Sequence, residues 1–123
     1  MNRTNEIFIM KKKFILKKRK EIDLIFKLKK NVRNYFFTLY YFKNISFDHF
    51  KFALSINKKY GKSHERNLIK RRIRMIIYQN ISLINSKASF VLVIKPSAKS
   101  LNFNELSQKI IYLLKKSFLI IPK

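Results

Sequence analysis

The sequence predicts an α+β fold, an α/β sandwich in which helices pack against one small sheet. Two kinds of pattern predict it. In three segments, apolar residues recur every three or four positions, which is the period of an amphipathic helix. Three shorter segments are aromatic-rich, alternating or continuously apolar, as strands are. The order along the chain is helix, strand, strand, helix, strand, helix, so helices are available to cover the sheet.

The first half of the chain is expected to form one short helix and two strands. The helix covers residues 20–29, where the helical spacing is carried by Ile22, Ile25, Phe26 and Lys29. Residues 36–42 are aromatic-rich and prone to form a strand. Residues 50–56 alternate between large apolar and smaller or polar side chains, as in a half-buried strand. The polar stretch between them, residues 43–49, suits a hairpin loop.

The next helix is expected to follow the only glycine in the chain. Gly61 lies where a strand must turn into a helix, which is a natural place for a positive φ angle. Ser63 can cap that helix, with Glu65 near its positive end. The helix is expected to span residues 64–79.

The remainder of the chain should add one buried strand and one helix. Residues 90–94 are continuously apolar, as in a strand covered on both faces, and Pro96 ends the run. Asn102 and Glu105 have the spacing of a capping box, with Asn in place of the usual Ser or Thr. The helix that follows carries its apolar face on Leu106, Ile110, Leu113 and Leu114.

Charge is the strongest indication of what the protein binds. Lys and Arg number 29 against 6 Asp and Glu, for a net charge of +23. A compact domain of that charge repels itself, and a polyanionic partner would neutralise it. Nucleic acid and an anionic membrane surface are the two candidates, and the strands disfavour a membrane-surface peptide. A compositional bias toward Lys explains part of the excess but not the scarcity of acids.

Composition disfavours several other functions. There is no Cys, so thiolate chemistry and disulfides are excluded. The six acids are scattered, and His49 and His64 lie far apart, so we expect no metal site and no catalytic residue in the protein. The acids are Glu6, Glu21, Asp23, Asp48, Glu65 and Glu105. No apolar run approaches the roughly 18 residues of a membrane span, and the lysines at 11–13 break any signal peptide.

A basic face is predicted on the central helix. At about 100° per residue, five polar side chains fall within an arc of roughly 140°. These are Arg66, Asn67, Lys70, Arg71 and Arg74. The adjoining arc is apolar and consists of Ile69, Ile73, Ile76 and Ile77. An Arg guanidinium can bind a phosphate through two hydrogen bonds, and an Asn amide can hydrogen-bond a base edge or a 2′-hydroxyl. A merely solvated face would mix charges, yet Glu65 is the only acid here, so we favour RNA binding.

The same segment carries a resemblance to a known family. Gly61, a short spacer, the run Arg66-Asn67-Leu68-Ile69-Lys70-Arg71 and then Arg74 resemble the signature of the ribonuclease P protein family, Arg-Asn-Arg-x-Lys-Arg-x-x-Arg. The resemblance extends from about Met10 to Leu119. Leu68 replaces the second Arg of the signature, so one expected phosphate contact is absent. Ile22 stands where an aromatic residue is common.

The resemblance implies a fold and a division of labour. The fold is ribosomal-S5-domain-2-like, with a left-handed βαβ crossover against the usual right-handed rule. The RNA subunit, with bound divalent metal such as Mg²⁺, performs phosphodiester hydrolysis. The protein binds no cofactor of its own and joins the RNA one to one. It holds the 5′ leader of precursor tRNA and promotes endonucleolytic 5′ maturation in the cytoplasm.

The resemblance also implies two binding surfaces. The surface for the RNA subunit would comprise Lys58, Lys59, Lys62, Arg66, Asn67, Lys70, Arg71 and Arg74. The leader cleft would be lined by Ile22, Phe26 and Tyr40, with Phe36 or Phe52 compensating for the stacking lost at Ile22.

The expected organisation is one domain with a short extension. Residues 1–9 are predicted to be a disordered N-terminal extension, and Met10 could be a second translation start. Residues 10–121 are predicted to form a single RNA-binding domain, in which the basic run 11–20 is extended and exposed. Two alternatives stay open at this point. A basic ribosomal or other structural RNA-binding protein shares the charge, and a protein-only nuclease would need a carboxylate cluster.

Overall fold

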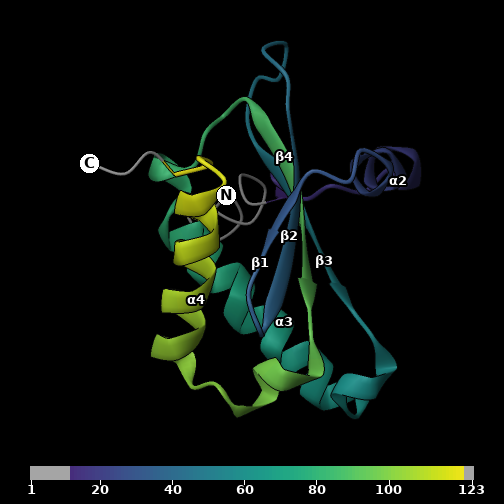
Figure 1. Ribbon diagram of the computed structural model, residues 1–123, viewed down its shortest axis with the longest axis vertical. Helices are drawn as coiled ribbons and strands as arrows, with labels where there is room; N and C mark the ends of the chain where they lie inside the picture. Colours follow the sequence, from purple (N-terminus) through teal and green to yellow (C-terminus); the bar gives the residue numbers. More distant parts are fainter. Residues whose placement is uncertain (1–11, 121–123) are drawn as a thin grey trace, which may run out of the picture.

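A four-stranded sheet with helices on both faces forms the body of the protein (Figure 1). The computed structural model describes residues 12–120. The helices are α2 (Arg19–Lys27), α3 (Ser63–Gln79) and α4 (Phe103–Lys116), and the strands are β1 (Asn31–Arg33), β2 (Phe37–Lys43), β3 (Lys51–Ile56) and β4 (Ala88–Ile94). Three 3-10 turns are η1 (Lys58–Tyr60), η2 (Ile81–Leu83) and η3 (Pro96–Ser100). The predicted α+β fold is confirmed, and β1 is a strand that the sequence pattern did not indicate.

The strand order is β1-β2-β4-β3, which corrects the expected hairpin. β2 pairs antiparallel with β4, and β3 pairs parallel with β4, so β2 and β3 are not neighbours. The reason lies in β4, where six of the seven residues are buried. A strand that is apolar on both faces belongs in the middle of a sheet, where it separates the two less buried strands. The segment 44–50 therefore crosses over β4 instead of forming a tight turn.

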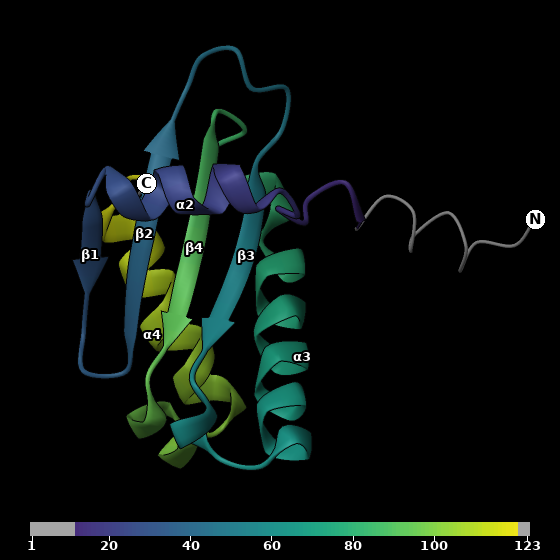
Figure 2. The same cartoon turned by 90° about the vertical axis from the view of Figure 1, so that its right-hand side faces the viewer.

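The β3–α3–β4 connection joins two parallel neighbours. Viewed with α2 in front, β3 lies to the right of β4, both strands point down, and α3 lies on the far side of the sheet (Figure 2). This arrangement is a left-handed crossover, the hand that the resemblance implied and the opposite of the common one.

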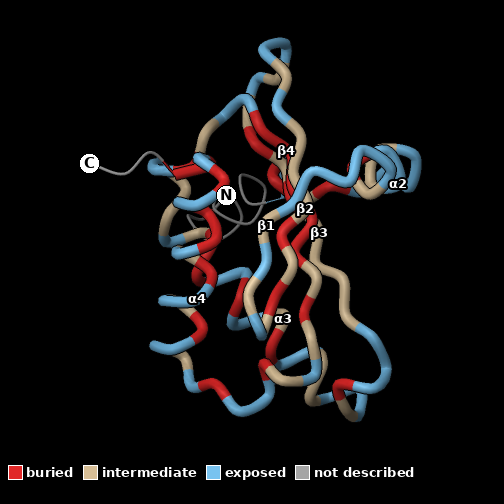
Figure 3. Tube along the Cα trace, in the orientation of Figure 1, coloured by how far each residue is buried: buried red, intermediate tan, exposed pale blue. Residues whose placement is uncertain are grey.

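Two apolar cores lie on the two faces of the sheet (Figure 3). The larger one fills the space between the sheet and the pair α3 and α4. Its helical part is the apolar face predicted for each helix: Ile69, Ile73, Ile76, Ile77, Leu106, Ile110, Leu113 and Leu114. The smaller core lies under α2 and is built on Leu16, Ile25 and Val91. Both faces of the sheet are therefore covered, and among residues 12–120 the second face carries one short helix, α2.

The basic run 11–20 was predicted to be extended and exposed, and over its described part this is correct only in places: residues 12–14 form a turn, residues 15–18 are extended, and α2 begins at Arg19. Phe14 and Leu16 are buried, at 7% and 4% exposure. The Leu16 N–H donates to the Phe52 carbonyl over 2.8 Å, and the Phe52 N–H donates to the Phe14 carbonyl over 2.7 Å. The run thus covers the open edge of β3, which would otherwise present unpaired backbone groups. The predicted extension 1–9 lies outside the described residues.

Local signals placed the helix ends with mixed accuracy. The capping box at α4 is confirmed: the Asn102 N–H donates to Glu105 Oε1 over 3.0 Å, and the Glu105 N–H donates to Asn102 Oδ1 over 2.9 Å. Ser63 is not the cap of α3, because it is the first residue inside the helix and Lys62 precedes it. α2 ends before Lys29, which has a left-handed φ of 56°. No helix within residues 12–120 is long and apolar enough to cross a membrane.

Candidate nucleic-acid interface

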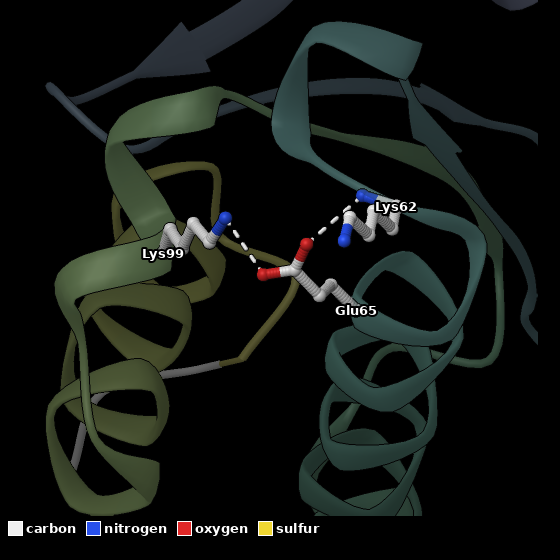
Figure 4. Close-up of polar contacts among 3 residues, drawn as sticks. All are labelled: Lys62, Glu65 and Lys99. Atoms are coloured by element: carbon white, nitrogen blue, oxygen red, sulfur yellow. Dashed lines mark hydrogen bonds and ion pairs between the residues drawn. The ribbon is translucent and has the colours of Figure 1, made fainter.

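The start of α3 is fixed by a glycine and an acid. Gly61 has φ 156° and ψ −163°, a conformation that is essentially restricted to glycine. A Cβ atom there would lie 2.8 Å from Glu65 Oε1. That oxygen accepts from the Lys62 N–H over 3.0 Å, and Oε2 pairs with Lys99 Nζ over 2.7 Å (Figure 4). The first turn of α3 is therefore tied to η3, which follows β4.

The Glu65 carboxylate is bound by groups of the protein itself. The hydrogen bond from Lys99, together with the one from the Lys62 N–H, lowers the pKa of the Glu65 carboxyl below its ordinary value of 4.5. Both bonds favour the ionised form. Nearby, burial raises the pKa of Tyr60, and the Lys99 charge opposes that shift. Because the carboxylate faces Lys99, the one acid of α3 leaves the cations further along the helix without an acidic partner on that helix.

The predicted basic face lies on the outside of α3. Asn67, Arg71 and Arg74 are exposed, and Arg66 and Lys70 are half-buried. A hollow of 280 Å³ opens between this face and the end of β3, lined by Ile56, Ser63, Arg66, Asn67 and Lys70. Arg66 Nη2 donates to Ser63 Oγ over 3.0 Å, which orients the guanidinium along the hollow. Two cations and an amide on a rigid helix make a site suited to a phosphate oxygen.

Three more of the predicted cations precede the helix in the chain. Lys58 and Lys59 lie in η1, Lys62 precedes α3, and all three are exposed. The Asn57 side chain accepts from the Lys59 N–H over 2.8 Å and so caps η1. All eight residues predicted for the basic surface thus lie in η1, at Lys62 or on α3, and three of them, Arg66, Asn67 and Lys70, line the same hollow. The structure also adds Met75 and Tyr78 on the next turns of α3, which the charge pattern gave no reason to select.

The predicted cleft is built under α2, which crosses the sheet (Figure 2). Ile22, Phe26 and Tyr40 are half-buried and pack against the smaller core. The Phe26 and Tyr40 rings meet edge to face, with centroids 4.9 Å apart and planes at 74°. These three residues of the predicted cleft are brought together, on the sheet face away from α3.

Phe36 and Phe52 lie on the opposite face and are not part of this cleft. Phe52 is fully buried in the larger core, while its neighbour Ala53 faces α2, because side chains alternate along a strand. Phe36 precedes β2 in a turn where its N–H donates to Asn34 Oδ1 over 2.9 Å. Its ring packs against the larger core, with Lys109 Nζ 5.8 Å from its centroid. Neither ring can replace stacking at Ile22.

A separate hollow of 430 Å³ lies between α2 and the segment that follows β2. Its lining includes Leu24 and Phe47 and two of the chain's six acids, Glu21 and Asp48. Acids at its rim make it a poorer site for a polyanion than the α3 face. His49, which also lines it, has Nε2 3.0 Å from the Lys13 carbonyl. Within residues 12–120, no three His, Asp or Glu side chains gather as metal ligands would.

Comparison with known proteins identifies the family. The family model described as Ribonuclease P matches residues 10–117. The ribonuclease P protein component of Onion yellows phytoplasma is 57% identical over 97 residues, covering 79% of this chain and 69% of that protein. The corresponding protein of Acholeplasma laidlawii is 40% identical over 111 residues, covering 90% of this chain and 95% of its own.

Solved structures agree with these matches. A Staphylococcus aureus RNase P protein mutant with defective mRNA degradation activity superposes with a TM-score of 0.88 at 27% identity, covering 98% of this chain and all of that one. The Thermotoga maritima RNase P protein gives 0.75 at 27% identity, covering 83% of this chain and 96% of that one. The ribosomal-S5-domain-2-like fold is thereby confirmed. The chain belongs to the bacterial ribonuclease P protein family, whose members are subunits of the endoribonuclease that matures the 5′ ends of tRNAs.

Proposed function

We propose that the basic surface around α3 binds the RNA subunit of ribonuclease P in a one-to-one complex. The residues are those predicted from sequence: Lys58, Lys59, Lys62, Arg66, Asn67, Lys70, Arg71 and Arg74. The observation that carries this proposal is that Arg66, Asn67 and Lys70 line one hollow on a helix whose only acid pairs with Lys99. Such a surface releases counterions from RNA when it binds, and this release drives the association.

The hollow beside Arg66 and Lys70 is the proposed centre of this interface. A backbone phosphate there would receive charge-assisted hydrogen bonds from both cations. Asn67 is exposed at the same hollow, and its amide can donate to and accept from a 2′-hydroxyl, a group that RNA has and DNA lacks. The site would therefore recognise the RNA backbone more than a particular sequence.

We infer that the cleft formed by Ile22, Phe26 and Tyr40 holds the 5′ leader of precursor tRNA. The support is a pair of half-buried aromatic rings on the face where α2 is the one helix among the described residues 12–120. Unpaired bases stack on such rings with little sequence preference, which suits leaders of different sequence. The leader and the RNA subunit would then meet different faces of the sheet. Phe36 and Phe52 are left out of this proposal because their rings pack in the other core.

We further propose that phosphodiester hydrolysis resides in the RNA subunit, with Mg²⁺ bound there, and that the complex acts in the cytoplasm. The protein's part is then to hold substrate and RNA in place. The support for this division is family membership.

Reconstitution tests the whole proposal. Cleavage of a precursor tRNA is measured with the RNA subunit alone, with the protein alone, and with both, at low magnesium. We expect cleavage only when both are present, because the protein offsets the lost screening of phosphate charge. The double variant Arg66→Ala, Lys70→Ala should lose this rescue and regain activity at high magnesium. Specific cleavage by nuclease-free protein without RNA would show that catalysis had been assigned to the wrong subunit.

A further inference from the structure

Beside the basic face of α3 lies a second hollow with a different chemical character. It measures 420 Å³ and is lined by Arg71, Arg74, Met75, Tyr78 and Gln79. Arg71 and Arg74 belong to the basic face, so the two surfaces are continuous. Met75 is 51% exposed between these arginines and the end of the helix. A large apolar side chain exposed beside two cations suits a partner that is both anionic and apolar.

The Tyr78 ring is held in place from the core side. Its centroid lies 5.9 Å from that of Phe52, and the two rings meet edge to face at 69°. Phe52 is fully buried, so this contact fixes the position of the tyrosine ring. Arg74 and Tyr78 line the same hollow; burial raises the pKa of Tyr78, and the Arg74 charge opposes that shift. The hollow therefore combines a rigid neutral ring, a flexible thioether and nearby cations.

We propose that this hollow takes one unpaired nucleobase of the RNA subunit, stacked against Met75 and Tyr78, with Arg71 and Arg74 on the flanking phosphates. The inference rests on the proposed role of the basic face. A nucleobase has an apolar π face attached to an anionic backbone, which matches what the hollow presents. A base inside a duplex is covered on both faces by its neighbours, so the base bound here must be unpaired and unstacked. The thioether of Met75 is polarizable and packs well against aromatic rings.

A salt series on matched variants tests the proposal. Affinity for the isolated RNA subunit is measured for the wild type, Met75→Ala, Arg74→Ala and Leu83→Ala. Met75→Ala should weaken binding about 2- to 12-fold, the range for a methionine contact with an aromatic ring. The slope of log affinity against log salt should not change, because methionine releases no counterions. Arg74→Ala should make that slope shallower by about 0.7–0.9.

Leu83→Ala is the control for simple truncation. Leu83 has the same exposure as Met75, 51%, but it lies outside the hollow, so its variant should bind as the wild type does. Wild-type affinity in Met75→Ala would overturn the proposal. A weaker affinity with a shallower slope would also overturn it, because the change would then have acted through the arginines.

Photo-crosslinking identifies the contacted nucleotide. The protein with Met75→benzoylphenylalanine should crosslink to unpaired nucleotides of the RNA subunit at one place, and crosslinks confined to duplex segments would contradict the stacking. The double variant Arg66→Ala, Lys70→Ala distinguishes failure of the nucleobase site from failure of the whole RNA interface on α3. If it lowers the salt slope while Met75→Ala has no effect, only the nucleobase site is lost. If neither changes RNA binding, the proposed function of the α3 face fails as well.

Discussion

Replacing Gly61 by Ala should destabilise the fold at the start of the basic helix. The backbone at Gly61 lies in a region that costs other residues about 1–3 kcal/mol. The added Cβ would also lie 2.8 Å from Glu65 Oε1 and 3.1 Å from Lys99 Nζ. Both atoms end flexible side chains, so they can move, but doing so breaks the bond from the Lys62 N–H. The backbone cost is therefore a lower bound on the loss.

For a chain of 123 residues, a loss of this size should lower the unfolding temperature by about 4–12 °C. Thermal and urea unfolding followed by circular dichroism measure it, and the dependence on urea should keep its slope. Lys62→Ala is the matched control: it adds no strain, since Lys62 has φ −68°, and should stay within about 0.5 kcal/mol of the wild type.

A second background, Glu65→Ala, separates the stability cost of the contact between the added Cβ and Glu65 from the cost of the backbone conformation. In Glu65→Ala the contact with Glu65 is gone and Lys99 Nζ is released from its ion pair and can move away, so adding Gly61→Ala should cost only what the backbone requires. If Gly61→Ala costs no more than Lys62→Ala, the assigned backbone conformation is wrong. If its cost is the same in both backgrounds, the conflict with Glu65 contributes nothing.

Three further predictions concern charge and stacking. Glu65→Gln should lower stability near pH 7. Its difference in stability from the wild type should shrink as pH falls through the depressed pKa of Glu65, because the carboxylate stabilises the fold only while it is ionised. A difference that stays constant down to pH 3 in urea titrations would exclude a role for the ionised carboxylate. Arg66→Ala with Lys70→Ala should make the salt slope for RNA-subunit binding shallower by about 0.7–0.9, the change for the one phosphate that both cations are proposed to bind, while the circular dichroism spectrum is kept. An unchanged slope means this face does not touch RNA. Tyr40→Ala should weaken precursor tRNA binding by about 1–3 kcal/mol but leave mature tRNA unaffected, with Tyr40→Phe as the control that keeps the ring; equal losses for both tRNAs would remove Tyr40 from the leader cleft.

Short-range signals in the sequence predicted the helices well. The spacing of Asn102 and Glu105 located the start of α4, and the 3.6-residue period placed the basic and apolar faces of α3 on adjoining arcs. The same period cannot show that Phe14 and Leu16 pair with β3, because that contact depends on partners distant in the chain. Gly61 was expected at a turn, but the ion pair of Glu65 with Lys99 was not, since nothing local to either residue indicates the other.

Strand positions were harder to predict, and this affected the candidate site. The alternation over residues 50–56 placed Phe52 and Ala53 on opposite faces without saying which face carries α2. Only the packing of α2 over Val91 and Ala53 decides that Phe52 faces α3 and supports Tyr78 instead of lining the cleft. β1 was missed because three residues are too few for a period-two pattern to stand out.

The placement of the few acids explains how so basic a chain keeps a usable RNA surface. Glu65 and Glu105 each accept a backbone N–H at the start of a helix, where the helix dipole favours negative charge. Glu21 and Asp48 line the hollow beside α2, so none of these four lies on the outward face of α3.

A ligand stabilises a fold only as far as it prefers the native chain, and an unfolded chain of charge +23 would itself attract RNA. Charge alone therefore selects neither a partner nor the fold. What the native state adds is geometry: a guanidinium oriented by Ser63, an amide beside it, and an aromatic ring fixed by Phe52. Substitutions that keep the charge but alter this geometry should therefore cost specific binding while leaving nonspecific RNA binding in place.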